Sequence, residues 1–341
     1  MKICQIVASS GLGGLEKHVV ELANALAKSE EVTVVAPQDM APFFAAPVRF
    51  VPFDFSRSRY NPLMLWDLLK VIERGDFDIV HAQANKAVSL LSKLRRFVPA
   101  KTLGTIHNCN KNKGRAFKNL DHVIAVSEAA GRLIDRRIPV TVVYNGIRLP
   151  DEIPVTDKRE LIAEFGLPDD RPLLCSIGRL VPAKGFDLLI DAIETVDASL
   201  LIVGAGPLQP DLQARIDELK LSHRVKLTGH RRDVPRIIAG CEGVVIASRY
   251  EGFSYVFAEA VLLGKPVLAT DVPVANEVLD KDLIMPIDSD AIRDKLIGCL
   301  CDSEFWRKKM EPVWRLARDR FELGVMADNT LAVYRKVLRQ S

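Results

Sequence analysis

Two glutamates lie eight residues apart in the stretch Glu251-Gly-Phe-Ser-Tyr-Val-Phe-Ala-Glu259. A short β-type run at residues 243–248 comes before this stretch, and an apolar, helix-forming segment overlaps its end. Gly252 and Ser254 therefore fall where a strand turns into a helix. Small residues there let a ligand approach the backbone, and the free N–H groups of a first helical turn bind anions.

Glu259 is expected inside the helix, on an otherwise apolar segment that Gly264 closes. A carboxylate in such surroundings is rarely left without hydrogen-bond partners, so it points to a polar ligand. Glu251 would face the same ligand from the turn. Two carboxylates beside a helix N-terminus suit a sugar that carries a phosphate. A plain strand–turn–helix junction, in which Glu251 only favours the helix dipole, is the alternative.

Two cations form a second candidate group, in Gly178-Arg-Leu-Val-Pro-Ala-Lys-Gly185. Arg179 and Lys184 both lie between a predicted strand and the next helix. A guanidinium and an ammonium in this position could bind a diphosphate and stabilise it as it leaves. Exposed cations that follow strands are also ordinary surface residues, and this spacing alone does not separate the two interpretations.

The loop after the first predicted strand is rich in glycine, in Gly11-Leu-Gly13-Gly-Leu-Glu16. It resembles a dinucleotide fingerprint, but Glu16 stands where the third glycine or alanine belongs. That side chain would hold the helix away from the strand and set a carboxylate against the pyrophosphate, which disfavours a nicotinamide or flavin enzyme. The glycines still favour contact with a phosphate or an acceptor, and a tight turn is the alternative.

His107 ends another predicted strand, beside Asn108. Ligands of open α/β sheets bind outside the carboxyl ends of the strands, so this position favours a binding role over a buried core histidine. Asp-x-Asp pairs occur at Asp76 and at Asp288. The first precedes a strand, and an N-cap explains the second, so neither supports a metal site.

The chain has 341 residues, enough for two domains that each bury a core. Its 47 Lys and Arg and 44 Asp and Glu give a net charge of +3, which singles out neither nucleic acid nor membrane. Residues 86–118 depart from this balance, with nine Lys and Arg and no acidic residue. This basic patch is either a solvated surface or a contact for an anionic membrane or a phosphorylated acceptor.

The six cysteines are scattered and form no C-x-x-C pair, which favours reduced thiols in the cytoplasm. The first residues have the pattern of a strand rather than of a signal peptide, and no run of about 18 apolar residues occurs. We therefore expect a cytoplasmic protein that is at most peripheral on the inner face of the membrane.

Strand-like runs alternate with amphipathic helices in both halves of the chain, which predicts parallel, doubly wound sheets. Prolines and charges interrupt the pattern after residue 149, and we expect a linker at 149–157. The chain is thus α/β, with a Rossmann-like domain at 1–150 and a second at 151–320 that face a central cleft. A helix at 321–341 would cross back to the first domain.

Taken together, these motifs resemble the retaining glycosyltransferases of family 4, which have the GT-B fold, over nearly the whole chain. The N-terminal glycine loop, the edge at Asn145, the Arg179 to Lys184 loop and Gly204-Ala-Gly206 match the family in order. The two glutamates match its E-x7-E signature. Arg148 stands where the family usually has Asp, and Ser254 replaces a usual glycine, so the fit around the donor phosphate departs from the family pattern.

The resemblance implies roles for residues of both domains. The catalytic residues would be His107, Glu251, Arg179 and Lys184. The donor would be bound by Gly13, Gly14, Arg179, Lys184, Gly204, His230, Arg231, Glu251, Gly252, Phe253, Ser254, Tyr255, Val256 and Glu259. The acceptor side would include Lys17, Asn108, Lys111, Lys113 and Arg115.

The resemblance also implies a metal-independent hexosyltransferase that needs no cofactor and uses a UDP- or GDP-linked sugar. The acceptor would be a glycan or a lipid-linked glycan, in bacterial lipopolysaccharide or other cell-surface polysaccharide synthesis. No nucleic acid partner is expected. A nucleotide-sugar epimerase of the same fold, or a non-catalytic subunit that binds sugar nucleotides, is the alternative.

Overall fold

The computed structural model describes residues 1–9, 13–108, 114–150 and 156–340. The chain divides into two compact units. The first unit contains Met1–Gly146 together with Arg320–Ser341, and the second contains Ile147–Asp319. The division after Gly146 lies four residues before the expected boundary at 150. The last segment of the chain belongs to the first unit, although it follows the second in sequence.

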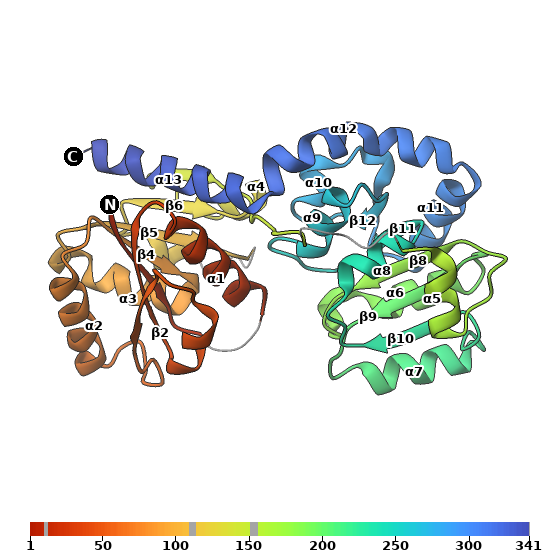
Figure 1. Cartoon of the computed structure of the whole chain (residues 1–341), viewed down its shortest axis with the longest axis horizontal. Coiled ribbons are helices and arrows are strands. Elements are labelled where there is room, and N and C mark those ends of the chain that lie inside the picture. Colours follow the sequence, from red (N-terminus) through yellow and green to blue (C-terminus); the bar gives the residue numbers. More distant parts are fainter. Residues whose placement is uncertain (10–12, 109–113, 151–155, 341) are drawn as a thin grey trace. The chain divides into compact units, whose positions relative to one another are not determined.

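The first unit is built on a parallel sheet of seven strands in the order β3-β2-β1-β4-β5-β6-β7 (Figure 1). The strands are β1 (Lys2–Val7), β2 (Glu31–Ala36), β3 (Arg49–Pro52), β4 (Ile79–Gln83), β5 (Lys101–Ile106), β6 (His122–Ala125) and β7 (Val140–Val142). Its helices are α1 (Gly14–Leu26), α2 (Pro62–Gly75), α3 (Ala84–Leu94), α4 (Glu128–Gly131) and α13 (Leu323–Arg339), with short 3-10 turns at Gln38–Phe43, Arg95–Phe97 and Gly114–Phe117. The strand order reverses beside β1, where ligands of doubly wound sheets bind.

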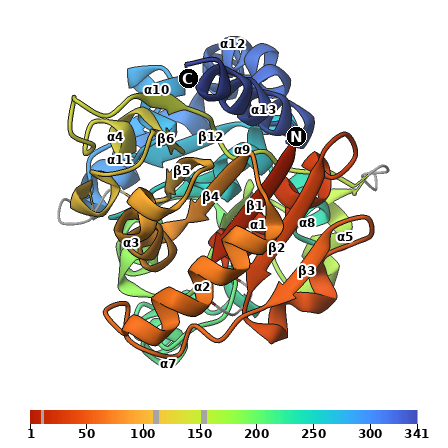
Figure 2. The ribbon, with the colours of Figure 1, turned by 90° about the vertical axis from the view of Figure 1, so that its left-hand side faces the viewer.

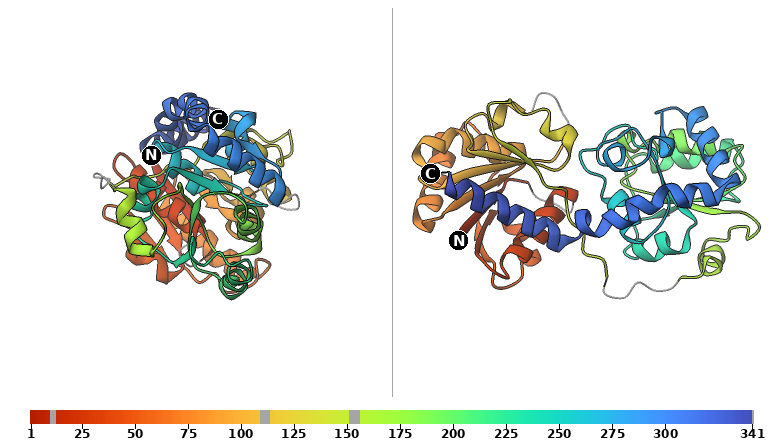
Figure 3. Two further views of the ribbon diagram at one scale, coloured as in Figure 1. Left: turned by 90° about the vertical axis from the view of Figure 1, so that its right-hand side faces the viewer. Right: turned by 90° about the horizontal axis from the view of Figure 1, so that it is seen from above.

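Each face of this sheet is covered by a different pair of long helices. On one face, α2 and α3 pack against Cys4, Ile6 and Val80. On the other, α1 and α13 pack against Ile3 and Ile79. Figure 2 shows α2 and α3 at the outside of this unit, and Figure 3 shows the length of α13 from above. The apolar stripe of α13 is thus part of the first unit's core.

The second unit repeats the architecture with a parallel sheet of six strands in the order β10-β9-β8-β11-β12-β13. The strands are β8 (Leu173–Ile177), β9 (Ser199–Val203), β10 (Val225–Gly229), β11 (Gly243–Ile246), β12 (Val267–Thr270) and β13 (Ile284–Met285). The helices are α5 (Lys158–Phe165), α6 (Phe186–Ile193), α7 (Gln209–Glu218), α8 (Val234–Gly240), α9 (Tyr255–Leu262), α10 (Ala275–Val278), α11 (Ser289–Cys301) and α12 (Ser303–Phe321), with 3-10 turns at Pro182–Lys184 and Lys281–Leu283. The predicted α/β class with two doubly wound domains is confirmed.

Several predicted helix ends have the expected chemistry. Asp288 caps α11, since its side chain accepts a hydrogen bond from the Ala291 N–H at 3.0 Å. After α9, Gly264 adopts a left-handed φ of +66°. The following Lys265 N–H donates to the Ala260 carbonyl at 2.9 Å, which completes a glycine C-terminal motif.

A buried hydrogen-bond chain ties α13 to the first sheet. The Tyr334 hydroxyl lies 2.6 Å from Nδ1 of His81 on β4, and His81 Nε2 lies 2.7 Å from the Thr105 hydroxyl on β5. His81 is fully buried, and burial lowers its pKa to about 3, so the ring is neutral. A neutral imidazole has one donor and one acceptor nitrogen, and both are used here.

We expect Tyr334→Phe to lower the free energy of unfolding by about 1 to 3 kcal/mol, because it leaves a buried ring nitrogen of His81 without its partner. Urea denaturation of the full chain measures this. Tyr60→Phe is the matched control, since Tyr60 is exposed and its change should cost almost nothing. Equal urea midpoints for the two variants would contradict a stabilising role of the hydrogen bonds between Tyr334, His81 and Thr105.

Candidate functional site

The loops that follow β8 and β9 approach each other so closely that only glycine fits. The Gly178 N–H donates to the Val203 carbonyl at 2.9 Å, and the Gly204 N–H donates to the Gly229 carbonyl at 2.9 Å. A Cβ on Gly204 would lie 1.9 Å from the Gly178 carbonyl oxygen. The backbone of Gly204, with φ of +145°, therefore lies at the carboxyl edge of the sheet without a side chain to cover it.

The loop from Gly178 to Gly185 is also fixed against the loop that follows β11. Gly185 has φ of +64°, and a Cβ there would lie 2.0 Å from the Ala247 carbonyl oxygen. The Arg249 N–H donates to the Ala183 carbonyl at 2.8 Å, and the Arg249 guanidinium forms two hydrogen bonds with Asp187 at 2.7 and 2.6 Å. These contacts hold the two predicted site loops together within the second unit.

Lys184 and Glu251 form an ion pair across these two loops. Lys184 Nζ donates to Glu251 Oε1 at 2.5 Å, and the Ser248 hydroxyl donates to the same oxygen at 2.8 Å. The side chains are 23% and 9% exposed, so the pair is largely shielded from water. Two residues that the sequence assigned to different parts of the donor are thus in direct contact, and Lys184 is oriented before any ligand binds.

Arg179 differs from its neighbour because it is exposed and has no partner. Its backbone lies between Gly178 and Leu180, whose N–H donates to the Ala205 carbonyl at 3.0 Å. Among the residues that the structure describes, none forms an ion pair or hydrogen bond with its guanidinium. All five guanidinium N–H groups are available to an anion at this edge.

The helix that begins inside the two-glutamate stretch is α9, and Ser254 is its N-cap. The buried Ser254 side chain accepts a hydrogen bond from the Phe257 N–H at 3.4 Å. The serine that departs from the family pattern therefore has a structural use, since glycine could not cap the helix in this way. The Phe253 and Tyr255 rings lie edge to face, with centroids 5.4 Å apart. Glu259 is half-buried on the same helix.

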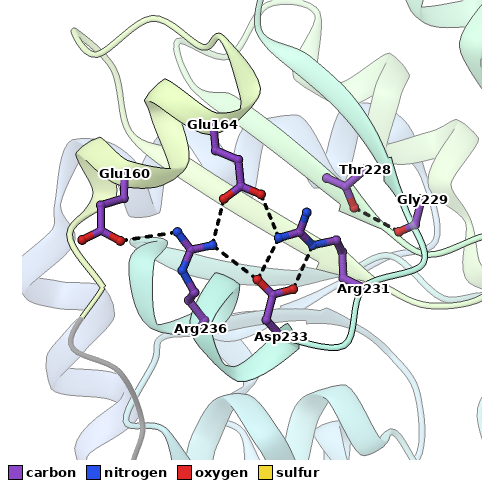
Figure 4. A network of polar contacts seen from close by, with 7 residues as sticks. All are labelled: Glu160, Glu164, Thr228, Gly229, Arg231, Asp233 and Arg236. Carbon is purple, nitrogen blue, oxygen red and sulfur yellow. Dashed lines mark hydrogen bonds and ion pairs between the residues drawn. The ribbon is translucent and has the colours of Figure 1, made fainter.

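The loop after β10 contains Gly229, with φ of +72°, and then the exposed His230. Arg231 is already engaged (Figure 4): its guanidinium donates to both Asp233 oxygens at 2.8 Å, and Nη2 lies 2.7 Å from Glu164 on α5. The hydrogen bond from Arg231 lowers the pKa of Asp233 to about 2. Arg236 extends this network to Glu164 at 2.8 Å and to Glu160 at 3.4 Å. The predicted role of Arg231 toward the donor remains a prediction.

The glycine loop of the first unit is described from Gly13 onward, and Gly13 is the N-cap of α1. Glu16 folds back over Gly13, because a Cβ on Gly13 would lie 2.8 Å from its Oε2. Glu16 is buried, whereas Gly14 and Lys17 are exposed. Of the other acceptor-side predictions, Arg115 is exposed and Asn108 is half-buried. Lys111 and Lys113 lie outside the described residues, as does Gly11.

His107 is half-buried and contacts a layer of buried polar side chains at the carboxyl edge of the first sheet. Its Nε2 is 2.9 Å from the Gln83 Oε1, and its ring meets that of His18 edge to face, with centroids 4.8 Å apart. Burial, followed by the charges of His18 and His81, holds the pKa of His107 well below its usual range. The ring is therefore neutral. Its Nε2–H donates to the Gln83 Oε1, and its Nδ1 is a hydrogen-bond acceptor.

His18 on α1 completes this layer. Burial lowers the pKa of His18 to about 4, which the neighbouring Asn145 amide partly opposes. No described residue lies in hydrogen-bond geometry with either ring nitrogen of His18, and the same holds for the Gln83 amide nitrogen. Gln83 and His18 were missed from the sequence. Gln83 could have been found, because it ends β4 as His107 follows β5.

Three of the nine cations in the basic patch at 86–118 are engaged within the first unit. Lys86 Nζ donates to the Phe55 carbonyl, and Lys93 Nζ donates to the Arg59 carbonyl at 2.7 Å. Arg95 forms an ion pair with Asp121 at 2.8 Å. These cations stabilise a long connection and a strand end, whereas Arg96, Arg115 and Lys118 are exposed.

Neither a metal site nor a membrane span is found in the described part of the chain. No group of three or more histidine, cysteine or acidic side chains there is arranged to hold a metal ion. No helix there combines the length and the apolar character that crossing a bilayer needs.

Two family models together match most of the chain. Residues 12–149 match the model described as Glycosyltransferase Family 4, and residues 157–309 match Glycosyl transferases group 1. The first match contains the glycine loop and His107. The second contains Arg179, Lys184 and both glutamates.

Individual relatives and a solved structure agree with these matches. The chain is 29% identical to an alpha-D-kanosaminyltransferase of Streptomyces kanamyceticus, over 53% of this chain and about half (49%) of that protein. It is 25% identical to a phosphatidyl-myo-inositol mannosyltransferase of Mycobacterium leprae, over 95% and 93% of the two chains. It is 28% identical to the lipopolysaccharide core biosynthesis mannosyltransferase LpsB of Rhizobium meliloti, over 48% of each. The crystal structure of Anabaena Alr3699/HepE in complex with UDP has the same fold, with a TM-score of 0.83, 21% identity and coverage of 98% and 100%.

We expect Lys184→Ala to destabilise the second unit by about 1 to 3 kcal/mol, because it leaves the shielded Glu251 carboxylate with Ser248 as its one remaining side-chain partner among the described residues. Arg179→Ala is the matched control and should leave the stability almost unchanged, since Arg179 is exposed and unpaired. Urea denaturation with pulsed hydrogen exchange follows peptides of each unit separately. If both variants had the urea midpoint of the wild type, the ion pair would not stabilise the second unit and this prediction would be wrong.

We also expect the first unit to lose stability as the pH falls from 7 to 5. His18, His81 and His107 have lowered pKa values in the folded chain, so below about pH 6.5 the unfolded chain takes up protons that the folded chain does not. His18 and His81, with pKa values of about 4 and about 3, then each contribute a loss of about 2 kcal/mol at pH 5, and His107 acts in the same direction. The same pulsed exchange measurement should show a smaller change in the second unit, whose His223 and His230 are exposed. An equal loss in both units would contradict this.

Proposed function

This chain belongs to the family 4 glycosyltransferases, and from this premise we propose that it transfers a hexose from a nucleotide diphosphate sugar to a glycan or lipid-linked acceptor. The observation that carries the proposal is the pair of neighbouring cations after β8. Arg179 is exposed and uncommitted, and Lys184 is held in one orientation by Glu251. Together they offer a fixed positive charge to a diphosphate.

These cations also support a reaction without a metal ion or cofactor. Breaking the bond between sugar and phosphate leaves negative charge on the diphosphate. A guanidinium and an ammonium that are already positioned can stabilise that charge as a divalent ion would. Arg179 would do so by bidentate hydrogen bonds, and Lys184 as a point charge that Glu251 holds in place.

The remaining donor contacts in the proposal come from backbone and carboxylates. Glu259 would accept hydrogen bonds from the ribose hydroxyls, and the first turn of α9 would bind phosphate or sugar oxygens through its N–H groups. The base would lie near Gly204 and His230. Because HepE was crystallised with UDP, we propose a uridine nucleotide as the first donor to test, with the guanosine nucleotide as the alternative.

We propose that the reaction retains the anomeric configuration by attack on the front face. The bond between the anomeric carbon and the phosphate oxygen breaks, and the acceptor oxygen bonds to the same face of that carbon. The acceptor's proton passes to the departing phosphate oxygen. Neutral His107 would contact the donor sugar as a hydrogen-bonding group, because its lowered pKa makes it a poor proton donor.

For the biological setting we propose bacterial lipopolysaccharide or other cell-surface polysaccharide synthesis, on the cytoplasmic face of the membrane. The names of two relatives support this setting: one is a phosphatidyl-myo-inositol mannosyltransferase, and the other is a mannosyltransferase of lipopolysaccharide core biosynthesis.

The test is calorimetric titration of the full chain with UDP, GDP and their glucose and mannose conjugates. We expect micromolar-range binding of one nucleotide class, unchanged by EDTA. Arg179→Ala should weaken it about 10- to 100-fold, the loss of one or two charge-assisted hydrogen bonds. Arg307→Ala, at an exposed arginine of α12, is the control and should bind as wild type does. No binding by wild type, or equal binding by Arg179→Ala, would overturn the proposed donor site.

A further inference from the structure

Helix α2 of the first unit has apolar residues on two sides, although only one side is needed for the core. Met64, Leu68 and Ile72 are buried against α3. Leu63 and Trp66 belong to the opposite side and are 64% and 57% exposed. A surface helix ordinarily has one apolar stripe and one polar side. The second apolar stripe therefore indicates a partner outside the unit.

A tyrosine in the turn before the helix adds to this stripe. Tyr60 precedes the N-cap Asn61 and is 73% exposed. Leu63 and Trp66 are three residues apart within α2, which keeps their side chains on one side of the helix. We call Tyr60, Leu63 and Trp66 the exposed stripe of α2. The helix itself lies at the outside of the first unit's sheet (Figure 2).

Cations surround the exposed stripe. Lys93 Nζ lies 3.9 Å from the centroid of the Tyr60 ring, and Lys70 Nζ lies 4.6 Å from that of Trp66. Arg57 and Arg59 are exposed just before the stripe. Arg57 is paired with Asp67 at 3.9 Å and Lys70 with Glu73 at 3.1 Å. Among the described residues, Arg59, Arg74 and Lys93 have no carboxylate partner, which leaves an excess of three positive charges.

The stripe is held in place before any partner binds. Two lysines one heptad apart on α3, Lys86 and Lys93, donate to the carbonyls of Phe55 and Arg59 in the connection that leads to α2. Asn61 caps α2 by accepting a hydrogen bond from the Met64 N–H at 3.0 Å. A surface that is already ordered loses little conformational entropy on binding.

We propose that the exposed stripe of α2 and its surrounding cations dock on an anionic lipid bilayer. Tryptophan and tyrosine favour the boundary between headgroups and hydrocarbon, leucine inserts beyond it, and Lys and Arg bind anionic headgroups. Among possible partners, an anionic bilayer matches apolar side chains and an excess of positive charge on one continuous surface.

The same connection also lines a cavity of about 590 Å³ at the carboxyl edge of β1, β2 and β3. Phe53 and Asp54 lie on one wall, and Ser9 and Gln38 lie on others. Aromatic, carboxylate, hydroxyl and amide groups are those that bind sugars. The cavity lining ends at Ser56, one residue before Arg57, where the cations of the docking surface begin. The bilayer contact would therefore bring a lipid-carried glycan close to the cavity, which deepens and rests on the proposed transferase function.

The test is sedimentation of the full chain with vesicles of phosphatidylcholine alone and of phosphatidylcholine with phosphatidylglycerol. We expect binding to the anionic vesicles, weakened by salt, and a shift of Trp66 fluorescence to shorter wavelength. Leu63→Ser with Trp66→Ser should weaken binding at least tenfold, as should Arg57→Ala with Arg59→Ala. These side chains are exposed, so circular dichroism should remain that of wild type.

Phe305→Ser is the matched control. Phe305 is an exposed aromatic residue of the second unit with Lys309 Nζ 5.5 Å from its ring centroid, and its loss should not change vesicle binding. Wild-type binding by the Leu63 and Trp66 variant, or no binding by wild type, would overturn the proposal. So would a wild-type dimer that this variant dissociates, because a second copy would then cover the stripe. Nucleotide titration of the same variants should be unchanged, so failure of the docking surface is distinguishable from failure of the donor site.

Discussion

The ion pair between Lys184 and Glu251 is the contact on which the candidate site of the second unit depends. It joins the loops that follow β8 and β11, which the backbone holds together at Gly185 and Ala183. A shielded carboxylate without a cation would be costly, so Glu251 fixes Lys184 whether or not a ligand is bound. Arg179 lies in the same loop as Lys184, after β8, and its exposed guanidinium has no ion pair or hydrogen bond among the described residues. Lys184 therefore has a fixed position in the candidate site, whereas the Arg179 side chain can adapt its position to an anion.

In the first unit the corresponding constraint is the layer of neutral imidazoles above the apolar core. His81 and His107 alternate with apolar residues on β4 and beyond β5, so they share the face that α1 and α13 cover. Their low pKa values follow from that cover, because a helix on top of the sheet removes water from the rings. The helix that supplies the Tyr334 hydroxyl comes from the end of the chain. Completing this layer thus requires the chain to pass through the second unit and return.

The sequence predicted two α/β domains with parallel, doubly wound sheets, because apolar runs bounded by glycine are strong signals in buried parallel sheets. It also predicted the caps at Asp288 and Gly264, which depend on local chemistry alone. It did not reveal that Lys184 contacts Glu251, 67 residues later, or that Arg231 is shared between Asp233 and Glu164. Such partners are set by which loops the fold brings together, and charge alone does not identify them. Residues that support others, such as Gln83 and Ser248, were missed for the same reason.

The sequence of helix α2 likewise does not show which of its apolar residues enter the core. Its sequence has apolar residues around most of its circumference, and only packing decides which of them enter the core. Met64, Leu68 and Ile72 meet α3, and that contact is complete without Leu63 or Trp66. The fold therefore gives no reason for a leucine and a tryptophan on the outer side, where polar residues would be more soluble. The lysines of α3 hold the adjoining connection while Lys93 also covers the Tyr60 ring. An apolar stripe that is rigid, exposed and bordered by cations is explained by a partner that is apolar within and anionic at its surface, as a bilayer is.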